Sequence, residues 1–369
     1  LKGPEIYNPI DNIRNATNRR NTVLANMVDD KKLSQADADS AAGVDMASLL
    51  DDTYQGTGDD YKYPSYFDAV IEEATKTYGL SEDVIVKNGY KIYTEMDANS
   101  QANMQQTYEN TNLFPTSESD GSTAQSASVA LDPTTGAVRG LVGRVGGTSD
   151  TTFRNFNYAT QGKRSPGSTI KPLVVYAPAL ASGWSINKDL PNTPIDYNGY
   201  TPTNYGGVET EDVPMYQALA NSYNIPAVYL FNQIGIQKGI SYGQKFGLNF
   251  DNVPEELGIS LGGGVTASPL QMAQAYATFA NGGEMNTAYF ITKIENASGD
   301  IIATHSKKSK RVISQSVANQ MTSMMLGTFS NGSAVNANYT GYTMAGKTGT
   351  VSFHLRQADE LHASVYVSH

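Results

Sequence analysis

The sequence predicts an α+β fold in which an antiparallel sheet is flanked by a helical subdomain. Strand-like alternation marks residues 89–97, 126–142 and 343–350, and helix-like segments fill the interval between the last two. At about 100–200 residues per domain, a chain of 369 residues allows two domains. We place the boundary near residue 88, so that residues 1–88 form a small N-terminal region and residues 89–369 form the main domain.

The N-terminal region is expected to contain two helices separated by a linker. The first helix lies within residues 1–36, where apolar residues recur on one helical face. Residues 37–63 are polar and rich in Asp, Gly and Thr, which indicates a linker or mobile loop. The second helix covers residues 66–78 and ends at Gly79, because glycine favours the left-handed conformation that terminates a helix.

The main domain is expected to begin with a strand at 89–97, followed by a β-hairpin. Residues 126–131 and 137–142 have strand character, and a turn at 132–136 joins them. The helical segments that follow lie at about 169–182, 214–222, 225–235 and 268–281. The last strand-like run ends at Thr350.

Composition excludes several kinds of chemistry. The net charge is −10 and no basic run is present, so nucleic acid is not an expected partner. Cysteine is absent, which removes thiol nucleophiles, thiolate metal sites and disulfides. Three of the four histidines lie close to the C-terminus, so the base of a hydrolase or acyl transferase is expected not to be histidine. No apolar stretch reaches the roughly 18–20 residues that span a bilayer, so we expect neither a membrane span nor a signal peptide within these residues.

Ser168 is the candidate nucleophile, with Lys171 as its base. A Pro-Gly turn precedes Ser168 and an apolar helix follows it, so the positive end of the helix stabilises negative charge on the serine oxygen. Residues i and i+3 share a helical face, so Lys171 Nζ can reach Ser168 Oγ, and burial lowers the pKa of such a lysine. The alternative is a capping serine and a solvated lysine, which is our interpretation of a second Ser-x-x-Lys at 185–188.

Two further motifs supply polar groups. Ser222 and Asn224 lie on a connection between helical segments, where the hydroxyl can relay a proton and the amide can hold a substrate amide. The alternative for this pair is a helix end followed by an Asx turn. The run Lys347-Thr348-Gly349-Thr350 ends a strand; its lysine and hydroxyls suit a carboxylate, and its glycine lets a ligand approach the backbone. The alternative there is a bulge glycine beside an ordinary edge lysine.

The order Ser-x-x-Lys, Ser-x-Asn, Lys-Thr-Gly is the motif set of penicillin-binding proteins and class A β-lactamases. Over residues 89–350 the sequence resembles the transpeptidase half of a class A, bifunctional penicillin-binding protein. This resemblance implies the penicillin-binding/serine β-lactamase-like transpeptidase fold. Residues 1–36 resemble the last helices of that family's glycosyltransferase domain, so residues 1–88 are expected to be the end of that domain and an interdomain linker. The catalytic glutamate motifs of the glycosyltransferase are absent.

The resemblance implies a DD-transpeptidase that cross-links peptidoglycan stem peptides ending in D-Ala-D-Ala and is acylated by β-lactams. Ser168 would attack the penultimate D-Ala carbonyl, Lys171 would take its proton, and Ser222 would pass it to the leaving amine. The backbone N–H groups of Ser168 and Thr350 would form the oxyanion hole, and Lys347 with its two neighbouring threonines would receive the terminal carboxylate. No cofactor or metal is implied. The full-length protein is expected to be anchored, through an N-terminal segment, at the extracytoplasmic face of a bacterial membrane.

Three alternative functions remain open. A class A β-lactamase needs a glutamate-held water; Glu255 and Glu256 stand near the required offset but lack the expected sequence context, so they are interpreted as surface acids. A DD-carboxypeptidase shares every motif and differs only in using water as the acceptor. A non-catalytic penicillin-binding scaffold is the third.

The C-terminal tail motivates the scaffold alternative. In the family, further strands and a helix follow the Lys-Thr-Gly strand, so the transpeptidase domain is expected to be truncated or altered after about residue 350. Alternation at 362–367 allows the tail to supply one replacement strand. We expect slower acylation or lower stability than in a chain of family length, because an unpaired strand would leave the oxyanion hole at an exposed edge.

Overall fold

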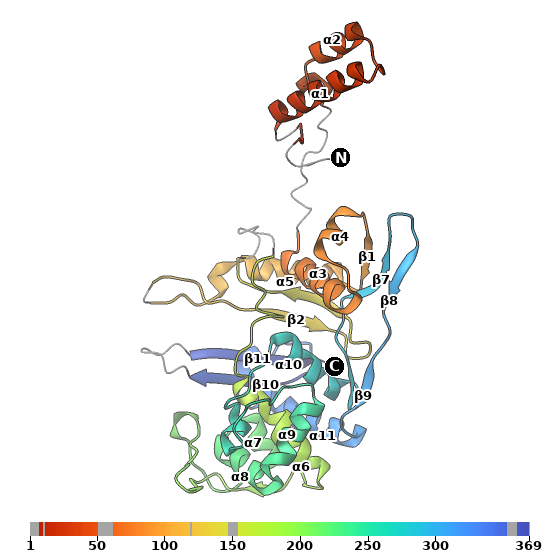
Figure 1. Cartoon of the computed structure of the whole chain (residues 1–369). Helices are drawn as coiled ribbons and strands as arrows, with labels where there is room; N and C mark the ends of the chain where they lie inside the picture. Colours follow the sequence, from red (N-terminus) through yellow and green to blue (C-terminus); the bar gives the residue numbers. More distant parts are fainter. Residues whose placement is uncertain are drawn as a thin grey trace. The chain divides into compact units, whose positions relative to one another are not determined.

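The structure is a computed structural model, and it describes residues 7–9, 12–50, 62–118, 120–146, 154–352 and 360–368. The chain divides into two compact units, residues 1–62 and residues 63–369 (Figure 1). Within the described ranges, no helix is both long enough and apolar enough to cross a membrane.

The first unit is a pair of helices, α1 (Ile13–Asp29) and α2 (Gln35–Gly43), that pack against each other. Helix α2 corrects the expectation of a linker from residue 37, because Ser34 caps its N-terminus by accepting a hydrogen bond from Asp37 N. Arg20 of α1 ties the far end of α2 by donating to the carbonyl oxygens of Ala42 and Val44. Most of the remaining expected linker, residues 51–61, lies outside the described residues.

The second unit begins with helices that pack on a small apolar core. Helix α3 (Pro64–Tyr78) ends at Gly79, which is left-handed as expected, and is followed by α4 (Glu82–Lys87). Tyr66 of α3 packs against Phe290 edge-on and donates a hydrogen bond to Val138 O. The expected domain boundary near residue 88 therefore lies inside the second unit, because α3 is part of that unit's core.

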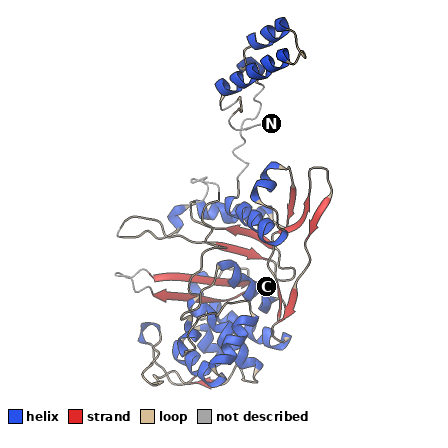
Figure 2. Cartoon of the chain, viewed as in Figure 1, coloured by secondary structure: helices blue, strands red, loops and turns tan. Residues whose placement is uncertain are grey.

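The strands of the described chain pair into small antiparallel ladders (Figure 2). The expected hairpin is present as β2 (Ser128–Leu131) and β3 (Val138–Val142), and α5 (Ala98–Glu109) packs against β3. The other ladders are β1 (Lys91–Thr94) with β7 (Ile291–Glu295) and β8 (Ile301–Thr304), β4 (Asp189–Leu190) with β5 (Val213–Pro214), and β6 (Glu284–Asn286) with β9 (Ser309–Arg311).

The expected Lys-Thr-Gly strand is β10 (Met344–Ser352), and β11 (Glu360–Ser368) pairs with it along its whole length. The tail thus supplies the one replacement strand that its alternation predicted. Lys347 is opposite Val365 and Thr350 is opposite His362 in this ladder. Helix α11 (Gln315–Ser330) packs against β10.

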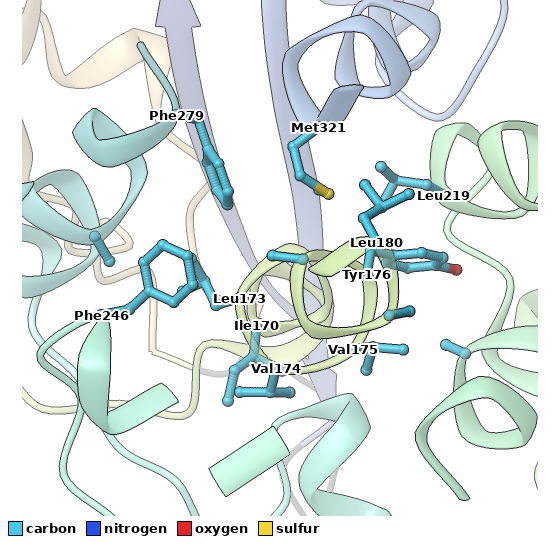
Figure 3. Close-up of a cluster of buried hydrophobic side chains, with 14 of the residues drawn as sticks. Ile170, Leu173, Val174, Val175, Tyr176, Leu180, Leu219, Phe246, Phe279 and Met321 are labelled. Carbon is cyan, nitrogen blue, oxygen red and sulfur yellow. The ribbon is translucent and has the colours of Figure 1, made fainter. Parts of the chain in front are cut away.

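A buried central helix runs from Gly167 to Ala181 through the main core, where its side chains meet neighbours on every side (Figure 3). The expected helix at 169–182 is not uniform. It starts as a 3₁₀ turn (Gly167–Ile170), widens into a π-helix (Pro172–Tyr176) and ends as α6 (Ala177–Ala181). Pro172 and Pro178 lack the backbone N–H that a continuous α-helix needs, so they interrupt its regular series of hydrogen bonds. The surrounding helices are α7 (Met215–Ala220), α8 (Asn224–Ile234), α9 (Ile236–Lys245), α10 (Pro269–Ala280) and α11.

Candidate active site

Ser168 lies in the 3₁₀ turn at the start of the central helix, half-buried while the residues that follow it are buried. Gly167 has a φ of +51°, and a Cβ built on it would lie 2.7 Å from Thr350 O. Only a glycine lets the serine turn approach β10 this closely. The local sequence thus brings the Ser168 backbone beside the strand that carries Thr350.

Hydrogen bonds hold this turn rigidly in place. Thr169 donates from both its backbone N–H and its hydroxyl to Pro166 O, at 3.1 and 2.6 Å. The buried Tyr276 of α10 donates to Thr169 O at 2.6 Å, and Ser165 Oγ donates to Gly262 O. A nucleophile on this turn is positioned by the scaffold before any ligand arrives.

Lys171 is fully buried and donates to three oxygens: Ser222 O at 2.7 Å, Tyr223 O at 3.0 Å and Asn224 Oδ1 at 2.8 Å. Three donated hydrogen bonds are the full complement of an ammonium group. The contact with Ser168 that the i, i+3 spacing predicts is not among the hydrogen bonds of the described residues. Neutral Lys171 has two N–H donors and a lone pair, so it must release one of these acceptors before it can accept a proton.

Lys347 is the second buried lysine, and like Lys171 it donates a hydrogen bond to Ser222. Its Nζ donates to Ser222 Oγ at 2.6 Å and to Thr348 O at 2.8 Å. Burial lowers the pKa of Lys347 to about 7. Burial also lowers the pKa of Lys171 well below its ordinary value, and the nearby positive charge of Lys347 lowers it further. Both lysines therefore lose their proton more readily than an exposed lysine does.

Ser222 accepts hydrogen bonds from the two lysines with different atoms. Its carbonyl oxygen accepts from Lys171, and its hydroxyl oxygen accepts from Lys347. Its φ of +58° is left-handed, which is uncommon for a residue with a side chain and is retained only where surrounding contacts impose it. Since its oxygen accepts from Lys347, the Ser222 hydroxyl proton is directed toward another acceptor. This geometry suits a proton relay.

Asn224 is held by groups on both sides. Its Oδ1 accepts from Lys171, and its Nδ2 donates to Thr203 O at 2.8 Å. The buried Asn204 accepts from the backbone N–H groups of Asn224 and Ile225, at 2.7 and 3.1 Å, and so caps the N-terminus of α8. Asn204 could not be predicted from the sequence, because an asparagine in a polar stretch with neighbouring glycines is typical of an ordinary loop.

The Lys-Thr-Gly motif presents its remaining groups along β10. Gly349 is buried and Thr350 is exposed. The Thr348 hydroxyl lies 2.6 Å from Ser333 Oγ, a second residue that sequence analysis did not select. Ser333 follows α11 in a Gly-Ser turn that no sequence pattern marks as part of a site.

The competing motif residues lie on the surface. Ser185 and Lys188 are exposed at a shallow cavity of about 390 Å³ that also adjoins Trp184. Glu255 and Glu256 are exposed directly before a 3₁₀ turn (Leu257–Leu261). The second Ser-x-x-Lys is therefore exposed, as its polar surroundings predicted. The two glutamates are exposed too, as expected of surface acids.

Comparison with known proteins assigns a family to this geometry. A family model described as the penicillin binding protein transpeptidase domain matches residues 126–365. Penicillin-binding protein 2a of Streptococcus pneumoniae is 58% identical over 351 residues, which cover 95% of this chain and 48% of that protein. Penicillin-binding protein 1F of Bacillus subtilis is 33% identical over 360 residues, which cover 95% of this chain and 48% of that protein. The chain spans about half the length of these curated relatives.

Solved structures show the same fold. The crystal structure of penicillin-binding protein 1A from Haemophilus influenzae matches with a TM-score of 0.70 and 21% identity, covering 95% of this chain and 70% of that chain. The PonA1 protein from Mycobacterium tuberculosis, in complex with penicillin V, matches with a TM-score of 0.68 and 23% identity, covering 83% and 84% of the two chains.

Proposed function

The chain belongs to the penicillin-binding protein transpeptidase family, and from this membership we propose that it is a peptidoglycan DD-transpeptidase working through an acyl-enzyme on Ser168. One observation carries the proposal: two buried lysines of lowered pKa converge on Ser222, and the helical turn of the first lysine carries the candidate nucleophile. Serine activation without histidine requires a base of this kind.

Acylation begins when Lys171 is neutral. Its lone pair takes the proton of Ser168 Oγ as the oxygen bonds to the carbonyl carbon of the penultimate D-Ala. The negative charge that develops on the carbonyl oxygen is stabilised by the backbone N–H groups of Ser168 and Thr350. The approach of Gly167 to Thr350 O supports this pairing, because it brings the two backbone segments together.

Collapse of the tetrahedral intermediate breaks the C–N bond to the terminal D-Ala. The leaving amine takes the Ser222 hydroxyl proton, and Ser222 Oγ regains a proton from protonated Lys347, which donates to it. Lys171 keeps the proton taken from Ser168, so the two lysines together carry one positive charge before and after the step. The amine of a second stem peptide then attacks the acyl-enzyme. The same relay runs in reverse and restores Ser168.

Substrate binding is assigned to the groups along β10 and to Asn224. Lys347 and the hydroxyls of Thr348 and Thr350 receive the terminal carboxylate, or the equivalent acid of a β-lactam. Gly349 leaves room for the peptide backbone. One Asn224 Nδ2 proton is donated to Thr203 O, and the other is available for a substrate carbonyl.

The N-terminal residues and the cellular location complete the proposal. Residues 1–62 contain the end of a glycosyltransferase domain and part of the interdomain linker, whereas helix α3, which the sequence assigned to the same region, packs in the core of the second unit. The full-length protein acts at the extracytoplasmic face of the bacterial membrane, anchored by an N-terminal segment.

The test supplies a donor peptide ending in D-Ala-D-Ala together with an amine acceptor, and follows both D-Ala release and the acyl product by mass. Aminolysis that disappears in Ser168→Ala is the expected result. D-Ala release with only the hydrolysed product would identify a DD-carboxypeptidase. A penicillin adduct without either product would identify a binding scaffold.

A further inference from the structure

The hydroxyl groups of Ser333 and Thr348 lie 2.6 Å apart at the exposed side of β10. Ser333 comes from the turn after α11 and lies outside the three motifs. Thr348 belongs to the Lys-Thr-Gly motif, and its carbonyl oxygen accepts from the buried Lys347 Nζ at 2.8 Å. Thr348 therefore contacts Ser333 through its hydroxyl and a buried lysine through its carbonyl oxygen.

The backbone fixes Ser333 independently of its side chain. Ser333 N donates to Ala220 O at 2.9 Å, at the end of α7 and just before the Ser-x-Asn turn. A Cβ on Gly332 would lie 2.3 Å from the same Ala220 O, so only glycine permits this approach. The turn thus connects two motifs, and truncation of the Ser333 side chain leaves its anchor intact.

Counting protons shows what the pair can do. Two hydroxyls carry two protons, and the hydrogen bond between them uses one. Neither hydroxyl has another acceptor among the described residues, so one O–H remains to be donated outward. A donor beside a lysine of the same site suits an anion, and a carboxylate accepts such hydrogen bonds strongly.

We propose that Ser333 is a further substrate-recognition residue, which pairs with Thr348 so that one hydroxyl proton is directed at the carboxylate of the acyl donor. This rests on the proposed function and adds a residue outside its three motifs. Ser333 acts on binding of the carboxylate, whereas Lys171 acts on the chemical step.

The test compares second-order acylation rate constants for penicillin G and for its methyl ester, which lacks the carboxylate charge. In Ser333→Ala the constant for the acid should fall about 10- to 100-fold, the loss typical of a hydrogen bond to a charged group, while that for the ester stays near wild type. Ser333→Thr keeps a hydroxyl and should restore the preference for the acid. Ser330→Ala, an exposed serine at the end of α11, is the matched control and should leave both constants unchanged.

Two outcomes would overturn the inference while the proposed function stands. An unchanged acid-to-ester ratio in Ser333→Ala would show that the hydroxyl does not recognise the carboxylate. An equal fall for acid and ester would show a structural role only. Failure of penicillin to acylate the wild-type chain at all would instead overturn the proposed function, and this inference with it.

Discussion

At the scale of single residues, the site is organised around one serine shared by two buried lysines. Ser222 presents its carbonyl oxygen to Lys171 and its hydroxyl to Lys347. Like charges in a buried site disfavour each other, so the positive charge of Lys347 lowers the pKa of Lys171. This arrangement supplies the base that the scarcity of histidine requires.

Removing the proposed base should abolish most of the chemistry. We expect Lys171→Ala to lower the acylation rate by about 10²–10⁴-fold, the usual contribution of a general base. Stopped-flow or gel-based penicillin labelling measures the rate, and a thermal melt shows whether the fold persists. Acylation of Lys171→Ala at the wild-type rate would place the base elsewhere.

The pH dependence of acylation should report the coupling between the lysines. Only neutral Lys171 accepts the serine proton, so the rate should rise with pH until Lys171 is deprotonated. Lys347→Gln removes a positive charge that lowers the pKa of Lys171. The pKa of Lys171 should then rise, and the acid limb of the rate profile should move to higher pH. An acid limb that stays in place or moves to lower pH would contradict the coupling.

At the scale of elements, the Ser-x-Asn turn depends on a loop that lies outside every motif. Asn204 accepts from two N–H groups at the start of α8 and donates through Nδ2 to Asn192 Oδ1 and Val208 O. Every hydrogen-bonding position of this buried amide is therefore used. The loop fixes Asn224, and through it one of the acceptors of Lys171.

Removal of the Asn204 cap should lower the stability of the folded protein. Asn204→Ala leaves the N–H groups of Asn224 and Ile225 without their acceptor, and we expect the free energy of unfolding to fall by about 1–3 kcal/mol. Denaturant melts of the variant and of Asn338→Ala, an exposed asparagine, provide the comparison. Equal stability of the two variants would show that water replaces the cap without cost.

Elements with strong local signals were predictable from the sequence, and those shaped by packing were not. The 126–142 hairpin and the end of α3 at Gly79 follow from turn and capping residues. Helix α9 was missed because its glycines lower helix propensity; a Cβ at Gly243 would lie 2.4 Å from the Phe250 ring, so packing requires them. Helix α2 was missed because polar composition outweighed its serine cap.

The candidate site could be selected from motifs, but its contacts could not. The motif order was enough to choose Ser168, Lys171, Ser222 and Lys347. That Lys171 and Lys347 meet on different atoms of Ser222 depends on how the central helix, the α7–α8 turn and β10 pack. Such packing between distant segments leaves no periodic signal in the chain.

At the scale of the whole molecule, the site belongs entirely to the second unit. Its residues lie between the central helix and β10, and the apolar core of residues 63–369 supports both. The helical pair of the first unit contributes no residue to the described site.

A chain restricted to residues 63–369 should therefore keep its melting temperature and its penicillin acylation rate. Calorimetry and labelling of the two lengths measure both quantities. A large loss of either in the shorter chain would show that the helical pair supports the site.

The most direct test of the central claim is the location of the covalent adduct. After incubation with penicillin, the intact mass should rise by one penicilloyl group, and peptide mapping should place that group on Ser168. Ser168→Ala should show no adduct, while Ser185→Ala, in the second Ser-x-x-Lys, should be labelled like the wild type. An adduct on Ser185, or labelling that survives Ser168→Ala, would contradict the account.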